Sequence, residues 1–252
     1  MFDLKGKVAI VTGGNGGIGL GMARGLATAG ARIIVAGRDQ KKSSAAVDDL
    51  KGRGAEAHAV AVDVTDQHAV GRMVDETTAR WGRLDILVNN AGINIRKPVQ
   101  DLALEEWHQV LDTNLTSAFL CSKAAYPAFK KAGGGKIINI GSMMSIFGAS
   151  FAPVYSSSKG GIVQLTKSTA VAWAKDNIQV NAVLPGWIDT DLTQNARREV
   201  SGLHDSVLRR TPVGRWGVID DMGGVAVFLA SAASDFVTGA VIPVDGGYSI
   251  QG

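Results

Sequence analysis

Short apolar runs rich in β-branched residues alternate along this chain with longer stretches in which apolar and small residues recur at helical spacing. The apolar runs do not alternate with polar residues, which is typical of strands that helices cover on both faces. The expected strands are 8–11, 32–37, 57–64, 84–92, 136–142, 178–186 and 240–247, and the expected helices lie near 17–30, 40–52, up to 81, 104–131, 153–175 and 219–230. Repeated strand–helix units predict an α/β fold: a Rossmann-type, doubly wound parallel sheet of about seven strands.

One stretch, residues 187–217, departs from this pattern because it is long, polar and weakly patterned, so we expect it to be irregular. No Pro- or Ser-rich linker divides the rest of the chain. A length of 252 residues suits one α/β unit with a single core. The whole chain, 1–252, is therefore predicted to form a single domain.

The charge pattern argues against a nucleic-acid partner. The net charge is +3, and the basic residues cluster only as the pairs 41–42, 130–131, 197–198 and 209–210. Nucleic-acid-binding proteins concentrate basic residues on one face. A solvated surface is the better interpretation of these pairs.

Cysteine content and hydropathy exclude further classes of protein. Cys121 is the only cysteine, so an intrachain disulfide cannot form, and we expect no metal site. The N-terminus lacks the pattern of a secretory signal, and no apolar run approaches the roughly 18 residues of a membrane span. We expect a cytoplasmic protein without a membrane partner.

The stretch TGGNGGIG, residues 12–19, links the first expected strand to the first expected helix. In that context Gly13 permits a tight turn, Gly17 lets the backbone approach a pyrophosphate, and Gly19 lets helix and strand pack closely. The N-terminus of the helix then presents free N–H groups to phosphate. A nucleoside-triphosphate loop is disfavoured because no Gly-Lys-Ser/Thr follows. The loop predicts a dinucleotide site.

The end of the second strand bears on the choice between NAD and NADP. An acidic residue there would accept hydrogen bonds from a free ribose 2′-hydroxyl and repel a 2′-phosphate. The chain has Gly37 followed by Arg38, whose planar guanidinium suits a phosphate. The sequence therefore favours NADP(H) over NAD(H), although Asp39 lies beside Arg38 and a solvated arginine is the alternative.

The stretch YSSSK places Tyr155 and Lys159 one helical turn apart. A phenol has a pKa of about 10, and a neighbouring ammonium favours its ionised form. The pair could thus transfer the hydroxyl proton that accompanies hydride transfer, with Ser142 as a hydrogen-bonding partner of the substrate oxygen. The alternative is a surface i, i+4 pair.

Together these motifs resemble those of the classical short-chain dehydrogenases/reductases. The motifs appear in the family's order over essentially the whole chain: TGGNGGIG at 12–19, DV at 63–64, NNAG at 89–92, Asn114, Ser142, Tyr155 with Lys159, and PG at 185–186. The resemblance implies NAD(P) binding, hydride transfer between the nicotinamide and a secondary alcohol or ketone, and a homotetramer.

The resemblance also implies roles for individual residues. The implied catalytic residues are Asn114, Ser142, Tyr155 and Lys159, with Asn114 holding a water that links Lys159 to solvent. The implied cofactor-binding residues are Gly13, Asn15, Gly17, Ile18, Gly19, Arg38, Asp63, Val64, Asn90, Ala91, Gly92, Tyr155, Lys159, Pro185, Gly186, Ile188 and Thr190. Asp63 and Val64 are expected at the end of the third strand.

Three stretches bear on the substrate. GINIRKP at 92–98, GSMMS at 141–145 and RWG at 215–217 are similar to those of the gluconate and deoxygluconate dehydrogenases within the family. A guanidinium at Arg96 suits the carboxylate of a sugar acid, and Ser142, Met144 and Trp187 are further candidates for substrate contact. In the family, the 187–217 segment closes over the substrate.

Other substrates and one other class of function stay open. A neutral polyol, a ketoacyl-type substrate or a general carbonyl compound would use the same proton chemistry. A non-catalytic protein that senses NADP would keep the glycine loop but would not need Asn114, Ser142, Tyr155 and Lys159 together.

Overall fold

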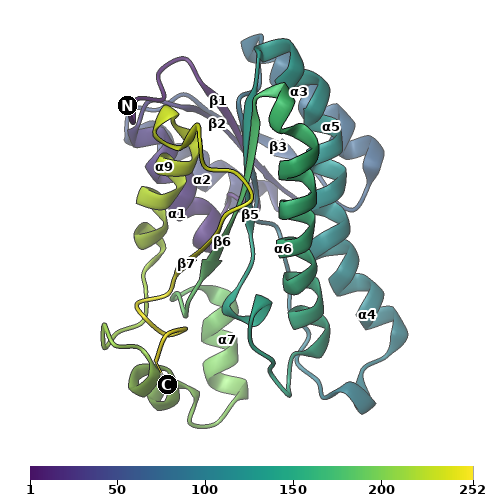
Figure 1. The fold of residues 1–252 in the computed structure, drawn as a ribbon, viewed down its shortest axis with the longest axis vertical. Coiled ribbons are helices and arrows are strands. Elements are labelled where there is room, and N and C mark those ends of the chain that lie inside the picture. The colour runs from purple at the N-terminus through teal and green to yellow at the C-terminus, as the bar shows by residue number, and fades with distance from the viewer. Residues whose placement is uncertain (252) are drawn as a thin grey trace.

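The computed structural model describes residues 1–251 and contains a seven-stranded sheet in the order β3-β2-β1-β4-β5-β6-β7. Every neighbouring pair of strands is parallel. The strands are β1 (Val8–Thr12), β2 (Arg32–Gly37), β3 (Ala57–Ala61), β4 (Ile86–Asn89), β5 (Gly135–Ile140), β6 (Ile178–Pro185) and β7 (Val241–Val244). The predicted doubly wound parallel sheet is confirmed (Figure 1).

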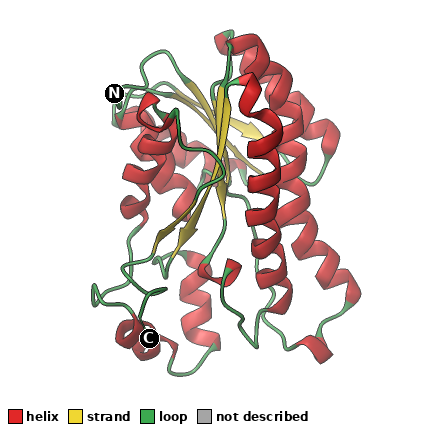
Figure 2. Ribbon diagram, in the orientation of Figure 1, coloured by secondary structure: helices red, strands yellow, loops and turns green. Residues whose placement is uncertain are grey.

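Helices cover both faces of the sheet. They are α1 (Gly17–Thr28), α2 (Gln40–Gly52), α3 (Gln67–Trp81), α4 (Leu104–Leu111), α5 (Ser117–Ala132), α6 (Pro153–Trp173), α7 (Asp191–Glu199), α8 (Leu203–Arg210) and α9 (Gly223–Ala230). In Figures 1 and 2, α1, α2 and α9 lie on one side of the strands, and α3, α5 and α6 lie on the other.

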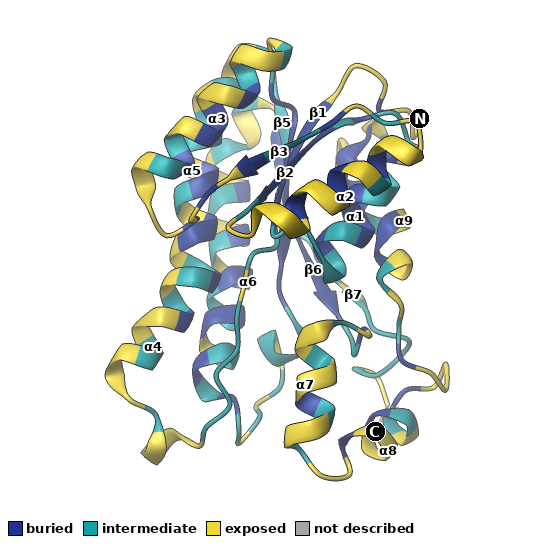
Figure 3. Ribbon diagram, turned by 180° about the vertical axis from the view of Figure 1, so that it is seen from behind, coloured by how far each residue is buried: buried dark blue, intermediate teal, exposed yellow. Residues whose placement is uncertain are grey.

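Two apolar cores follow from the period of two along each strand. Ala9 and Val11 of β1 pack with the α1–α2–α9 layer, whereas Val8 and Ile10 pack with the α3–α5 layer. The central strands β1, β2 and β4 are buried on both faces, so apolar residues occupy most of their positions. Figure 3 shows these strands as a buried layer between helices whose outer faces are exposed.

The long helix expected at 104–131 is interrupted. A π-helical turn, Asp112–Thr116, separates α4 from α5, and it contains the buried Asn114. Such turns are rare in proteins, and those that occur are often found at functional sites. Hydrophobic spacing did not reveal it, because the residues on both sides continue one helical pattern.

The expectation that residues 187–217 are irregular is wrong. The segment forms α7 and α8, which share a small apolar cluster that includes Ala196, Val207 and Trp216. Its two ends are joined to each other: the Asp189 N–H donates to the Gly217 carbonyl at 2.8 Å, and the Gly217 N–H donates to Trp187 at 2.9 Å.

Helices α1 and α9 approach each other through glycines. A Cβ added at Gly25 would lie 2.6 Å from the Gly223 backbone, and one at Gly21 would lie 1.9 Å from the carbonyl oxygen of Ile219. Ile219 lies in the 3-10 turn that precedes α9. Helix α1 is therefore in direct backbone contact with the turn that follows residues 187–217 and with the start of α9.

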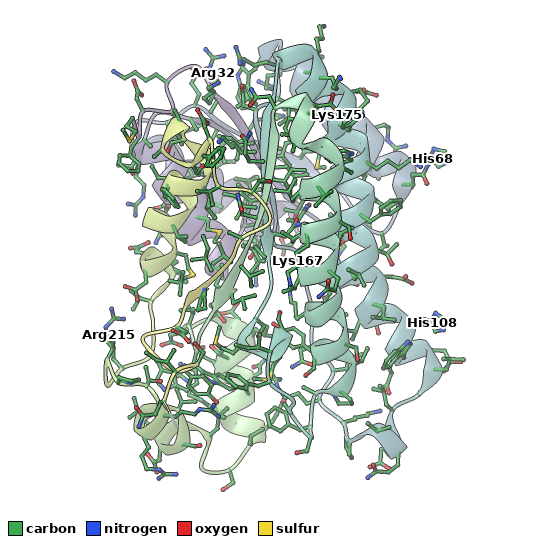
Figure 4. All side chains as sticks on the ribbon, viewed as in Figure 1. Arg32, His68, His108, Lys167, Lys175 and Arg215 are labelled. Atoms are coloured by element: carbon green, nitrogen blue, oxygen red, sulfur yellow. The ribbon has the colours of Figure 1, made fainter. Side chains whose placement is uncertain are left out.

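Basic side chains are spread over the molecule. Arg32, His68 and Arg215, which are labelled in Figure 4, lie on separate parts of the chain at the periphery of the view. Arg215 is paired with Asp221 at 2.7 Å. None of the helices among residues 1–251 is long and apolar enough to cross a membrane.

Candidate active site

Two adjoining cavities, of about 360 Å³ and about 530 Å³, lie at the carboxyl ends of the strands. Strand order reverses between β1 and β4, and a crevice at that point is where open α/β sheets bind ligands. We call the smaller cavity, which contains Tyr155, the catalytic cavity, and the larger one, which contains Arg38, the adenine-side cavity. Apart from Gly19 and Asn114, all the residues predicted for catalysis, cofactor or substrate line one of the two.

The glycine loop has the shape that a pyrophosphate requires. Gly13 and Gly17 have φ values of +62° and +51°, in the left-handed region that favours glycine. A Cβ at Gly19 would lie 2.5 Å from the Gly13 carbonyl oxygen, so only glycine allows the start of α1 to pack this closely against the loop. No side chain caps the N-terminus of α1, so its N–H groups stay free for an anion. These residues fit the pyrophosphate of a dinucleotide.

Thr12 and Asn90 fasten the loop to the end of β4. The Thr12 hydroxyl accepts the N–H groups of Asn90 and Ala91 at 3.0 and 3.1 Å, and the Asn90 amide donates to the Thr12 carbonyl at 3.0 Å. Asn89 points the other way, into the interface with α5, where it donates to Ser122 and Asn139. Asn90, Ala91 and Gly92 are thus the part of this motif that faces the cofactor cavities.

The adenine-side cavity brings Arg38, Asp63 and Val64 together, as predicted. Asp63 and Val64 lie beyond β3, which ends at Ala61, so their placement in the strand is corrected to the loop after it. Hydrogen bonds from Thr65 hold the pKa of Asp63 below its usual range, and the Arg38 charge lowers it further. Asp63 is therefore ionised at neutral pH.

Asp39 is occupied by the helix that follows it. Its side chain caps α2 by accepting the N–H of Lys42 at 3.0 Å. Lys42, one turn beyond Arg38, lines both cavities, and it pairs at 3.5 Å with Asp191, the first residue of α7. The i, i+4 spacing of Arg38 and Lys42 was present in the sequence, but Lys42 was missed.

Ser142 follows β5 and caps a 3-10 turn, Met143–Ser145. Its hydroxyl accepts the Met144 N–H at 3.1 Å, and its own N–H donates to the Ser145 hydroxyl at 3.2 Å. Ser145 in turn donates to the Lys159 carbonyl at 2.7 Å. Ser145, which sequence reasoning placed only near Ser142, ties the Ser142 turn to the helix that carries Tyr155 and Lys159.

Tyr155 and Lys159 lie one turn apart on α6, with the Lys159 Nζ 5.6 Å from the centre of the phenol ring. Burial raises the pKa of Tyr155, while the Ser142 hydroxyl and the Arg96 charge act in the opposite direction. Burial lowers the pKa of Lys159 to about 8. Lys159 donates to the Ile140 carbonyl at 2.7 Å. Burial therefore outweighs the two opposing effects on the Tyr155 pKa, and the lowering of that pKa by Lys159 stays a prediction.

Asn114 lies behind the cavity wall and holds it in place. Its Oδ1 accepts the Ile93 N–H at 2.8 Å, and its Nδ2 donates to the Ile93 carbonyl at 2.9 Å and to Ser158 at 3.0 Å. A Cβ at Gly92 would lie 3.1 Å from the Asn114 Oδ1 and 3.6 Å from the Lys159 Nζ. Asn114 thus positions the loop after β4 beside Lys159, and its role in a water relay stays a prediction.

The chain after β6 forms the far wall of the catalytic cavity. Pro185, Gly186, Ile188 and Thr190 all line it. Thr190 caps α7, and its methyl group would lie 3.3 Å from a Cβ at Gly17. The glycine loop and the start of the 187–217 segment are therefore in near contact.

The candidates for substrate contact lie on the same cavity as Ser142 and Tyr155. Met144 and Trp187 line it, as does Arg96. The Arg96 side chain is only 12% exposed and reaches across to α7, where it pairs with Glu199 at 2.8 Å and donates to the Leu192 carbonyl at 3.0 Å. Sequence reasoning missed this internal carboxylate partner.

The fold and this arrangement of residues define a nicotinamide-dependent oxidoreductase of Rossmann type. A family model described as enoyl-(acyl carrier protein) reductase matches residues 13–249. The chain belongs to the short-chain dehydrogenase/reductase family, and it is an oxidoreductase acting on CH–OH groups.

Relatives of similar length are known. The 2-dehydro-3-deoxy-D-gluconate 5-dehydrogenase of Bacillus subtilis is 44% identical over 98% of this chain and 96% of its own. The gluconate 5-dehydrogenase of Gluconobacter oxydans is 37% identical over 100% of this chain and 98% of its own. The crystal structure of a gluconate 5-dehydrogenase from Burkholderia cenocepacia J2315, in complex with NADP and tartrate, is 40% identical with a TM-score of 0.93, covering 99% of this chain and 97% of that one.

Proposed function

We propose that this protein is an NADP-dependent dehydrogenase that interconverts a secondary alcohol and a ketone on a sugar acid. One observation carries the proposal: the cavity that contains Ser142 and Tyr155 also contains a nearly buried guanidinium, Arg96. A polyhydroxy acid has both the secondary alcohol and the carboxylate that such a cavity suits. The relatives named for gluconate and 2-dehydro-3-deoxygluconate, and the one bound to NADP and tartrate, support the same substrate class.

In this proposal the chain's own residues handle a proton. Ser142 hydrogen-bonds the substrate oxygen, the Tyr155 phenolate accepts the substrate proton during oxidation, and the Tyr155 phenol donates a proton during reduction. Lys159, buried between Tyr155 and Ile140, supplies positive charge next to the phenol. A bound oxidised nicotinamide would supply the hydride acceptor. We call residues 187–217 the lid, because in this proposal the segment closes over the substrate.

A substrate panel tests the proposal. Reduction of NADP⁺ is followed with gluconate and deoxygluconates, neutral polyols and simple secondary alcohols, and oxidation of NADPH with the matching ketones and a 3-ketoacyl thioester. We expect the highest kcat/KM on a sugar acid. A preference for the ketoacyl thioester or for neutral ketones would reject the substrate class, and no turnover on any compound would favour a protein that only senses the cofactor.

Arg96→Ala is expected to lower kcat/KM on a sugar acid by about 10- to 150-fold, since a hydrogen bond to a charged group contributes about 1.5–3 kcal/mol. Activity on a neutral polyol should change much less. Steady-state kinetics on the two substrates measure the difference, and Arg198→Ala, an exposed arginine of α7, is the matched control.

Glu199→Gln separates carboxylate binding from lid anchoring. It removes the negative charge of the residue that pairs with Arg96 at 2.8 Å, and it leaves the guanidinium available. If Arg96 binds the substrate, this variant keeps or lowers the KM for a sugar acid. Equal losses in Arg96→Ala and Glu199→Gln on every substrate would show that the arginine only anchors the lid.

We also propose that NADP(H) is preferred over NAD(H). Asp39, whose carboxylate would otherwise weaken the case, is occupied as the cap of α2. A Cβ at Gly37 would lie 2.7 Å from the Asn15 Nδ2, so an acidic side chain at that position would have to displace Asn15. Arg38 and Lys42 supply two positive charges around the same cavity.

Lys42→Met and Arg38→Ala should each weaken binding of 2′,5′-ADP about tenfold while leaving binding of 5′-AMP unchanged, because only the former carries the 2′-phosphate. Calorimetric titration gives both dissociation constants, and the ratio of kcat/KM for NADP to that for NAD should fall in parallel. Lys41→Met is the control, because Lys41 lines neither cavity. An unchanged ratio in both variants would remove these residues from cofactor selection.

We also propose a homotetramer and a cytoplasmic location, of which the homotetramer rests on the family resemblance. Exposed apolar side chains on the two long helices, Phe119 of α5 and Val171 of α6, support burial of this face against another subunit. Sedimentation equilibrium of the wild type, compared with a Val171→Glu variant, tests the assembly.

A further inference from the structure

An asparagine of the GINIRKP stretch that was not among the predicted site residues lies in the wall of the catalytic cavity. Asn94 lines this cavity with Ser142, Tyr155 and Arg96. The Asn94 Oδ1 is buried and has no hydrogen-bond partner among residues 1–251. Buried polar side-chain atoms are nearly always hydrogen-bonded, so an unpaired one in a ligand cavity needs an explanation.

A loosely held loop does not explain it, because the residues on both sides are fixed. Ile93 is bonded through both its N–H and its carbonyl to Asn114, at 2.8 and 2.9 Å. Arg96 is bonded to Glu199 and to the Leu192 carbonyl. Asn94 is therefore held against the cavity by a short segment with anchors at each end, as a pre-organised binding residue is.

A second unpaired group lies in the same wall. The indole Nε1–H of Trp187 is buried and has no acceptor within the part of the chain that the structure describes. Its ring packs edge-on against Trp216 at 5.5 Å, which fixes its orientation. The cavity thus offers one unpaired amide oxygen and one unpaired N–H donor in addition to Ser142 and Tyr155.

We infer that Asn94 and Trp187 bind hydroxyl groups of the substrate that are not the reacting one. A hydroxyl donates to an amide oxygen and accepts from an indole N–H, so the same chemical group satisfies both. A carboxylate has no hydrogen to give to the Asn94 oxygen. This inference rests on the proposed function and narrows it: the substrate is polyhydroxylated, and Asn94 and Trp187 bind hydroxyls other than the reacting one.

The test uses a sugar acid and its analogues that each lack one hydroxyl. For wild type, we expect kcat/KM to be about 100-fold lower on one analogue than on the parent acid, because the missing hydroxyl leaves Asn94 unpaired. Asn94→Leu should lose activity on the parent acid but no longer discriminate between the parent and that analogue. Asn94→Asp, which keeps an acceptor, should retain the discrimination.

Trp187→Phe gives an independent arm, because it keeps the ring and removes the N–H, and it should abolish discrimination against a different analogue. Asn195→Leu, at an exposed asparagine of α7, is the control, and thermal denaturation checks that each variant is folded. If Asn94→Leu and Trp187→Phe both discriminate as wild type does, the inference is wrong while the proposed function stands. If wild type turns over no sugar acid, both fall.

Discussion

Tyr155→Phe is expected to lower kcat/KM by about 10³- to 10⁴-fold, which is the upper part of the range for a lost general acid–base group. The substitution removes one oxygen atom and leaves the ring between Ser142 and Lys159. NADPH binding, followed by its fluorescence, should stay within about twofold, because the glycine loop is untouched. Tyr126→Phe is the control. The Tyr126 phenol is on α5 and donates to Asp176 at 2.7 Å, and its loss should leave activity unchanged.

The pH dependence of the wild-type rate is a second test of the role of Tyr155. Burial raises the pKa of Tyr155, so the phenolate that accepts a proton is gained as the pH rises. The rate of alcohol oxidation should therefore increase toward alkaline pH, and the rate of ketone reduction should decrease. If Tyr155→Phe retains more than a tenth of wild-type activity, Tyr155 is not the residue that exchanges a proton with the substrate.

Gly21→Ala is expected to destabilise the fold by at least about 3 kcal/mol, at the upper end of what overpacking costs. The added Cβ would lie 1.9 Å from the Ile219 carbonyl oxygen, and a backbone atom cannot turn away as a flexible side chain can. For a chain of this size, that corresponds to a fall in Tm of about 6–12 °C. Thermal denaturation followed by circular dichroism measures it.

The matched control is Gly71→Ala. Gly71 lies inside α3, and a Cβ there would meet nothing within 4 Å. Alanine is about 1 kcal/mol more favourable than glycine in a helix, so this variant should gain a few degrees in Tm. Equal effects at the two positions would show that backbone contact between α1 and the turn before α9 does not limit stability.

The sheet could be predicted because its signal is local. The central strands are buried on both faces, so most of their length is apolar, and the run 32–37 coincides with β2 (Arg32–Gly37). The helices of the 187–217 segment were not predicted, because their apolar positions, such as 196, 203 and 207, lie among many charged and polar residues. Its helices are stabilised by a cluster with Trp187 and Trp216, which lie at the two ends of the segment, and spacing along one helix does not show such contacts.

Some residues of the site could likewise be predicted from local sequence, and others could not. Gly13, Ser142 and Lys159 belong to motifs whose chemistry can be read from neighbouring residues. Asn94 and Lys42 gain their roles only where distant parts of the chain meet: one lies in a wall with Ser142 and Tyr155, and the other reaches α7. The pKa of the phenol likewise depended on burial, which the spacing of Tyr155 and Lys159 could not reveal.

The hydrogen bonds that join residues 187 and 189 to Gly217 have an evolutionary consequence. They close the lid at its base, so the chain enters and leaves it at one place on the rim of the sheet. Doubling the length of such a loop costs only about 0.6 kcal/mol in closure entropy. Insertions, deletions and new side chains can therefore accumulate between these two points without moving β6 or the glycine loop. The half of the molecule that binds the nicotinamide can stay constant while the lid diversifies, so that descendants of one ancestral enzyme acquire different substrates.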